Sequence, residues 1–129
     1  MKKIITLIAI LLISSVGFAQ SGPKIDFTAN DNTIDYGKVS KANDNGVRVF
    51  EFTNTGNAPL IITSIQSTSN CTIVSSTKDP ILPGKKGKIE IKYSMNAGPI
   101  RKTITVESNA VNYDEGRVAL KIKGEVIAN

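Results

Sequence analysis

Few side chains in this sequence could take part in catalysis, and histidine is missing. The 129 residues contain no histidine, which removes the most common general base and histidine-ligated zinc. The single cysteine, Cys71, stands between the neutral residues Asn70 and Thr72, which provide no positive charge to activate a thiol. Composition alone therefore excludes hydrolytic triads and Cys-His pairs.

Pairs of carboxylates could still act together, as they do in glycoside hydrolysis. The candidates lie in expected turns or at strand ends, where Asp is common for reasons of turn geometry. They are Asp31, Asp35, Asp44, Asp79, Asp114 and Glu115. The segment 43–46 resembles a calcium loop only superficially, because Phe52 stands where such a loop needs a glutamate. We therefore expect no enzyme, and no catalytic residue, metal site or cofactor.

Cys71 is open to three interpretations. It could be a reactive thiol, it could form a disulfide with another molecule, or it could be a small apolar residue of the core. A lone cysteine has no partner within the chain, so the fold must be stable without a disulfide. A free cysteine is usually buried, which favours the core.

Three lysines, Lys85, Lys86 and Lys88, follow the turn Pro83-Gly84. Such a cluster could bind a phosphate, a sulfate or an acidic glycan. It could also be a solvated turn whose charges prevent edge-to-edge pairing of the next strand. The sequence alone does not separate the two.

Aromatic rings for sugar stacking are scarce, because the chain has no tryptophan. Phe50 and Phe52 are expected in the core, and Tyr93 is in phase with a buried strand face. This leaves Tyr36 and Tyr113 as the candidate exposed rings for a ligand.

The first 19 residues have the pattern of a secretory signal peptide. Lys2 and Lys3 precede the apolar run 4–13, and the small residues Gly17 and Ala19 predict cleavage after Ala19. The run is shorter than the roughly 20 residues of a membrane span. We expect an exported protein, periplasmic or extracellular, with no transmembrane segment after cleavage. Without Lys2 and Lys3 the formal net charge falls from +5 to +3, which is mild and argues against nucleic-acid binding.

Beyond this segment, apolar and polar residues alternate with a period of two, as in strands with one buried face. Ile89, Ile91 and Tyr93 form one such series, and Val118 and Leu120 belong to another. The expected strands are 24–28, 34–39, 46–54, 59–66, 71–75, 87–94, 100–107 and 117–127. Seven or eight short strands separated by turns predict an all-β, immunoglobulin-like sandwich.

Two local predictions concern turns and irregularities. The Asn45-Gly46 pair suits a tight hairpin, because both residues tolerate positive φ. The alternation slips between Val49 and Phe50, which suggests a bulge or a strand that is dry on both faces. Between Thr53 and Leu60 the chain must reverse, and we expect Gly56 to take a left-handed backbone there.

Several motifs, in order, resemble the DUF1573 family of small exported Ig-like domains, which are widespread in Bacteroidetes. More distantly, they resemble Hydin/ASPM-type and PapD-like sandwiches. The motifs are FEFTNTGNAPLII from Phe50, SNCT from Ser69, PILPGKKGKIEIKY from Pro80, KTITVESN from Lys102 and LKIKGEV from Leu120. The resemblance covers about residues 32–127 and implies an Ig-like fold and export. The family pattern usually reads Cys-Gly-Cys-Thr where this chain has Ser69-Asn70-Cys71-Thr72, so no paired-thiol role transfers.

The expected organisation is a signal peptide (1–19), an N-terminal segment with a first short strand (20–31), and an Ig-like domain (32–129). We expect a non-catalytic binding or assembly module of the cell envelope. It would recognise another envelope or secreted protein through loops or a sheet edge, and self-association stays open. The alternative is a glycan- or anion-binding domain that uses Lys85, Lys86 and Lys88.

Overall fold

A computed structural model describes residues 21–128 of the chain, and the predicted signal peptide lies outside this range. The described residues form eight strands and two short 3-10 helices, close to the expected boundaries. The strands are β1 (Ile25–Phe27), β2 (Thr33–Ser40), β3 (Val47–Asn54), β4 (Ile62–Gln66), β5 (Cys71–Ser76), β6 (Lys86–Tyr93), β7 (Gly98–Ser108) and β8 (Arg117–Ile127). The helices are η1 (Asn30–Asn32) and η2 (Asp114–Gly116). No helix among the described residues has the length and apolar character that a membrane span needs.

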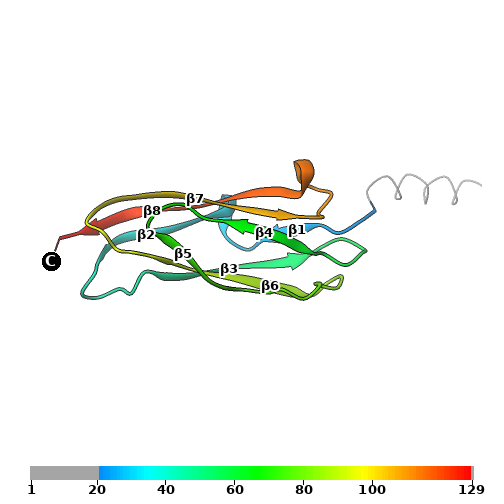
Figure 1. The fold of residues 1–129 in the computed structure, drawn as a ribbon, viewed down its shortest axis with the longest axis horizontal. Helices are drawn as coiled ribbons and strands as arrows, with labels where there is room; N and C mark the ends of the chain where they lie inside the picture. Colours follow the sequence, from blue (N-terminus) through cyan, green and yellow to red (C-terminus); the bar gives the residue numbers. More distant parts are fainter. Residues whose placement is uncertain (1–20, 129) are drawn as a thin grey trace, which may run out of the picture.

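The strands form two four-stranded sheets that pack face to face, as the sequence predicts (Figure 1). One sheet has the order β1-β3-β6-β5 and the other β2-β8-β7-β4. All pairs are antiparallel except β2 with β8, which is parallel. The first short strand, β1, pairs with β3 and so belongs to the sandwich.

The alternation in the sequence determines which side chains fill the space between the sheets. On β6, Ile89 and Ile91 are fully buried while Lys88 and Lys92 are exposed. On β8, Val118, Leu120 and Ile122 are buried in the same way. These side chains join one continuous core, which supplies the apolar burial that stabilises a chain with one free cysteine.

The expected irregularity at Val49 and Phe50 is wrong. The pairing of β3 with β6 is continuous from Val47 to Thr53. Phe50 and Phe52 point inward, and Arg48 occupies the inward position before them, so Val49 points outward and is 44% exposed. The apparent slip arose because a charged residue stands at an inward position and apolar residues stand at outward ones.

The predicted hairpin at Asn45-Gly46 is also wrong. Gly46 has φ +82°, but Asn45 is not among the residues with positive φ. However, β2 and β3 belong to different sheets, so this loop crosses from one layer to the other. Local turn chemistry predicted the reversal of the chain but not the partners of the two strands.

The free edges of both sheets are short or irregular. β1 has three residues, and the pairings of β2, β4 and β5 with their neighbours each contain a register shift. Bulges and short strands at an edge disfavour pairing with another chain. These edges therefore give little support to partner recognition by strand addition.

Candidate functional site

The loops gather at the two opposite ends of the sandwich (Figure 1). We call one the ridge end; it comprises the loops 55–61, 77–85 and 109–116. We call the other the C-terminal end; it comprises the loops 41–46, 67–70 and 94–97 together with residue 128.

At the ridge end, two loops join through a single antiparallel bridge. The backbone N–H groups of Leu60 and Ile81 each donate to the carbonyl oxygen of the other residue at 2.8 Å. Both side chains point into the core, with exposed fractions of 0% and 3%. Because side chains alternate along extended backbone, the flanking residues point outward.

These outward residues are apolar and exposed. Ile61 is 42% exposed, Leu82 is 54% exposed, and Pro59 and Pro80 are exposed as well. The antiparallel register places Pro59 across from Leu82 and Ile61 across from Pro80. We call these four residues the apolar ridge. Exposed apolar residues that lie together on a surface mark sites of interaction.

Asn54 holds the ridge from below. Its side chain is fully buried, and its amide nitrogen donates to the carbonyl oxygens of Ala58 and Ile81, both at 2.8 Å. Its amide oxygen accepts from the backbone N–H groups of Gly56 at 2.9 Å and Lys24 at 3.2 Å. One side chain therefore joins the N-terminal segment to both loops of the ridge.

Other asparagines complete this network. Asn109 accepts from the N–H of Ile61 at 2.8 Å and donates to the carbonyl oxygen of Pro59 at 3.2 Å. Asn112 makes a reciprocal pair with the backbone of Ile25, at 3.1 and 3.0 Å. Together with the buried amide of Asn54, these more exposed amides connect backbone groups of separate segments and hold the loops in one conformation. The ridge is therefore preorganised.

Gly56, in the chain reversal between Thr53 and Leu60, has a different role from the one expected. Gly56 is not among the residues with positive φ. A Cβ atom at this position would collide with the carbonyl oxygen of Gly22. Gly56 is therefore required for close approach of two backbones and not for a left-handed turn.

The three predicted lysines lie beside the ridge. Lys85 ends the turn that follows Leu82, and its N–H donates to the carbonyl oxygen of Leu82 at 2.9 Å. Lys86 and Lys88 point outward from β6. Thr77 closes the segment by hydrogen bonds to the backbone of Lys88 at 3.0 Å. All three lysine side chains are exposed.

The predicted aromatic candidates do not provide exposed rings. Tyr36 is only 6% exposed, and its hydroxyl donates to the carbonyl oxygen of Gly46 at 2.7 Å. Burial raises the pKa of Tyr36 to about 12. Tyr113 is partly buried against the core, and its hydroxyl accepts from the amide of Asn32 at 3.3 Å. The expectation for Tyr36 as a ligand-stacking residue is wrong, because this ring fills the space between the sheets.

Cys71 begins β5, and the residue is 6% exposed. The hydroxyl of Ser67 donates to its carbonyl oxygen at 2.6 Å. This placement agrees with the interpretation of Cys71 as a core residue. A disulfide to another molecule would require this end of β5 to open.

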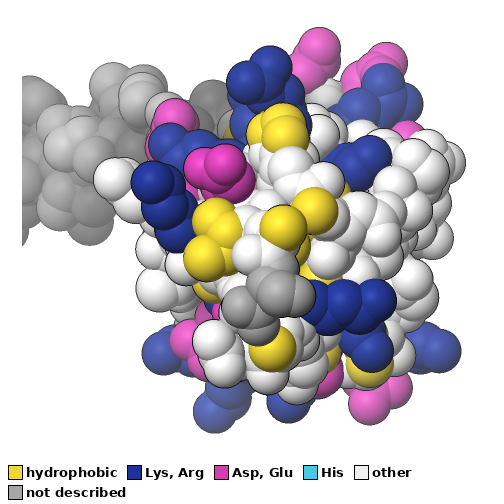
Figure 2. Space-filling view, turned by 90° about the vertical axis from the view of Figure 1, so that its left-hand side faces the viewer, with side chains coloured by type: hydrophobic (Ala, Val, Ile, Leu, Met, Phe, Trp, Pro, Cys, Tyr) yellow, Lys and Arg dark blue, Asp and Glu magenta, His cyan; other side chains and the backbone are white. Residues whose placement is uncertain are grey.

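The C-terminal end has an apolar depression and a charged closure. Ala42, Ala97 and Ile127 line a depression of about 540 Å³, and Ile127 is 45% exposed. Figure 2 shows this face, with apolar side chains grouped near its centre and lysine and arginine around them. Lys41 borders this depression and a neighbouring one of about 520 Å³ that Lys92 also lines.

Arg48 closes this end from the inside. Its guanidinium lies 4.0 Å from the centre of the Tyr36 ring and forms an ion pair with Asp44 at 2.8 Å. The hydrogen bond from Arg48 is the main reason that the pKa of Asp44 is lowered. The N–H of Gly46 donates to Asp44 as well, at 2.7 Å. These contacts hold the loop between β2 and β3.

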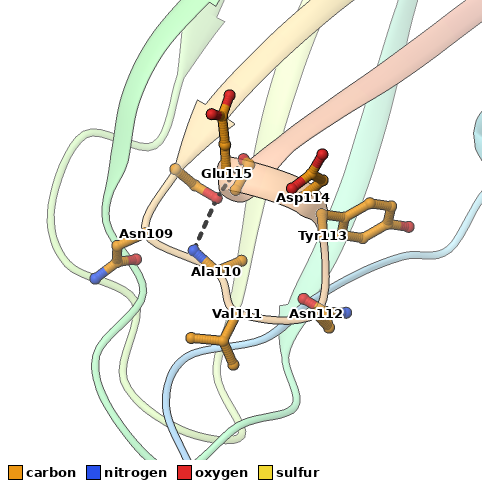
Figure 3. A pocket seen from close by; sticks show the side chains of 9 residues that line it. Asn109, Ala110, Val111, Asn112, Tyr113, Asp114 and Glu115 are labelled. Atoms are coloured by element: carbon orange, nitrogen blue, oxygen red, sulfur yellow. Dashed lines mark hydrogen bonds between the residues drawn. The ribbon is translucent and has the colours of Figure 1, made fainter.

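The loop 109–116 encloses a shallow depression of about 680 Å³, shown in Figure 3. Ser108 holds this loop by donating to the carbonyl oxygen of Gly116 at 3.0 Å and accepting from the N–H of Ala110 at 3.1 Å. The side chains of Asp114 and Glu115 point to the side away from Val111 and Asn112. Both acids are exposed, and no cluster of metal ligands is found within residues 21–128.

Sequence reasoning located the lysines but missed the apolar ridge and Asn54. The sequence did contain a signal for the ridge, which is two runs of three apolar residues, Pro59-Leu60-Ile61 and Pro80-Ile81-Leu82. The middle residue of each run is buried, and a strand with one solvent-exposed face does not require apolar residues on either side of it. The hydrogen-bonding role of Asn54 left no such trace, because its partners are backbone groups of distant segments.

Several solved structures share this fold. A protein of unknown function from Porphyromonas gingivalis W83 is 19% identical, with a TM-score of 0.65 over 84% of this chain and 49% of that chain. The secreted serine protease VesC from Vibrio cholerae is 17% identical, with a TM-score of 0.58 over 80% of this chain and 23% of that chain. The ASH/PapD-like domain 7 of human CEP192 is 12% identical, with a TM-score of 0.53 over 82% and 87%.

These likenesses establish the fold and leave the activity open. The chain spans about half the length of the P. gingivalis protein and about a quarter of the Vibrio protease. No curated protein matches the chain. Residues 27–126 match the family described as "Protein of unknown function (DUF1573)", and this match covers nearly all of both sheets. The chain belongs to the DUF1573 family.

Proposed function

We propose that this domain is a non-catalytic binding module of the cell envelope that recognises a protein partner through the apolar ridge. The observation that carries the proposal is an exposed pair of aliphatic side chains, Ile61 and Leu82, on two loops that Asn54 and the Leu60–Ile81 bridge hold together. A preorganised apolar surface binds without the cost of ordering its loops. The signal-peptide pattern of residues 1–19 supports the envelope location in this proposal.

A non-catalytic role is supported by composition and by the fold. The chain has no histidine, and its exposed acids Asp114 and Glu115 border an open depression. The likeness to a PapD-like domain fits a module that binds other proteins, although that likeness concerns the fold only.

Retention of a partner by immobilised protein tests the proposal. Leu82→Asp places a carboxylate in the centre of the ridge, and desolvating it on binding should weaken retention by about tenfold or more. Ile127→Asp is the matched control, since Ile127 is similarly exposed but lies at the C-terminal end. Proteins from an envelope extract should be captured by the wild type and the control and lost with Leu82→Asp. An identical set of captured proteins for all three would contradict the proposal.

A second candidate function is binding of an acidic glycan or another anion by Lys85, Lys86 and Lys88 alone. Its support is that all three side chains are exposed, and neither ion pair found among the described residues includes them. Replacing all three with Ser should then abolish retention on an immobilised acidic polysaccharide at low salt, while Leu82→Asp should leave it unchanged. Weak retention of the wild type that merely follows its net charge would exclude this function.

A further inference from the structure

We propose that the ridge selects a protein segment in which apolar side chains are flanked by carboxylates, an inference that rests on the function proposed above. The ridge and a group of lysines belong to the same two loops. The turn from Leu82 to Lys85 is closed by a backbone hydrogen bond of 2.9 Å, and Gly84 within it has φ +80°, a conformation that favours glycine. The lysine backbone is therefore held at the margin of the ridge.

The charge of this margin is positive and only partly offset. Segment 77–88 contains Lys78, Lys85, Lys86 and Lys88 against the single acid Asp79, all of them exposed. Lys88 lies across from Glu51 of β3 in the sheet and two positions before Glu90, which offset its charge.

Asp79 directly follows Lys78 and offsets that lysine in the same way. Lys85 has no neighbouring acid in sequence or in strand register, and Lys86 has none directly across from it, because its register partner is Thr53; Glu51 lies only diagonally to Lys86. An apolar contact with a cationic margin is complementary to apolar side chains next to Asp or Glu.

Other occupants fit this surface less well. A sugar would need an exposed aromatic ring, whereas the ridge consists of aliphatic and proline side chains and Tyr36 is buried. A second copy of this chain could offer Asp114 and Glu115, but the positive net charge, +3 without Lys2 and Lys3, opposes the approach of two copies. A partner with acidic residues is favoured by both the local and the overall charge.

Selection from a library of random peptides displayed on phage tests the inference without knowledge of the natural partner. The immobilised wild type should enrich peptides that carry Asp or Glu beside Leu, Ile, Val or an aromatic residue. Synthetic copies of the enriched peptides should bind about fivefold more weakly to the double variant Lys85→Ser, Lys86→Ser. This difference should shrink between about 0.1 M and about 1 M salt, as the Debye length falls from about 10 Å to about 3 Å.

The control variant Lys41→Ser, Lys92→Ser removes two exposed lysines from the C-terminal end and gives the same change in net charge. It should bind the peptides as the wild type does. Equal weakening by both double variants would overturn the inference, because only the overall charge would then matter.

The remaining outcomes separate this inference from the function it rests on. Peptides that lose binding with Leu82→Asp but show no acidic preference would overturn the charge selection and leave ridge binding in place. Peptides that bind the Leu82→Asp variant as tightly as the wild type, or an absence of any enriched peptide, would count against both the charge selection and ridge binding. Enrichment of purely acidic peptides whose binding is unchanged by Leu82→Asp would establish anion binding instead. Concentration-dependent dimerisation of the wild type that Leu82→Asp abolishes would identify a second copy as the occupant.

Discussion

The two ends of this sandwich are closed by different chemistry. At the ridge end, the buried amide of Asn54 satisfies backbone groups of several segments, and the exposed Asn109 and Asn112 add further hydrogen bonds to the backbone. At the C-terminal end, Arg48 stacks on Tyr36 and pairs with Asp44. Neutral amides that lie beneath the loops leave the outer surface available for aliphatic residues. At the C-terminal end the closing group is a partly exposed cation, which places charge close to the apolar residues of that end.

The comparison predicts that the ridge end contributes more stability, and Asn54→Ala should have the largest effect. The substitution removes four hydrogen bonds of a fully buried side chain and leaves backbone donors and acceptors without partners. We expect the free energy of unfolding to fall by about 3 kcal/mol or more, measured by urea denaturation. The matched variant Asn96→Ala, at an exposed position of the C-terminal end, should change it by less than about 0.5 kcal/mol. Similar losses for the two variants would refute the central position of Asn54.

Arg48→Ala should have an intermediate effect of about 1–2 kcal/mol on the free energy of unfolding. It removes the contact with the Tyr36 ring and the packing of a long side chain against that ring. Arg117→Ala is the control, since its ion pair with Glu107 is well exposed and should contribute less than about 0.5 kcal/mol. If both arginine variants lost equal stability, the stacking on Tyr36 would have no special role.

Acid should affect the C-terminal end through Asp44. Because Arg48 lowers the pKa of Asp44 in the folded protein, the ionised carboxylate stabilises the fold above the unfolded pKa of about 4. This contribution is lost as the pH falls through the lower, folded pKa. The stability difference between the wild type and Asp44→Asn should therefore shrink below about pH 4, as urea denaturation at several pH values would reveal. A difference that is constant with pH would mean that the charge of Asp44 is unimportant.

The smallest effect on folding is expected for the triple variant Lys85→Ser, Lys86→Ser, Lys88→Ser. These side chains are exposed and make no ion pair described for residues 21–128. The free energy of unfolding, measured by urea denaturation, should therefore stay within about 0.5 kcal/mol of the wild-type value. A larger loss of stability would show that the lysines, and not only the asparagine amides, help to stabilise the ridge end.

Much of the architecture could be predicted because one face of each strand is buried. Alternation along Ile89-Ile91-Tyr93 and Val118-Leu120-Ile122 located both strands and the core, and the structure confirms them. The prediction failed where a polar residue occupies an inward position, as Arg48 does. Its apolar neighbour Val49 points outward, so the pattern looked like an irregular strand.

The candidate site could be predicted only in part. Charge next to a Pro-Gly turn is visible in the sequence, and Lys85, Lys86 and Lys88 are exposed in the structure, while their role in binding stays a prediction. Tyr36 was misplaced because a tyrosine is compatible with both surface and core. Its burial depends on Arg48 and on Gly46, which come from the following loop and strand.

The sequence by itself determined the class of fold, the approximate strands and the absence of histidine chemistry, because these depend on composition and on a period of two. Only the tertiary structure decided that β2 and β3 belong to different sheets, that Asn54 joins three segments and that four apolar residues form one ridge. The physical reason is that alternation records which way a side chain faces. Hydrogen bonds and surface patches depend on which distant segments meet, and that is settled only when both sheets pack.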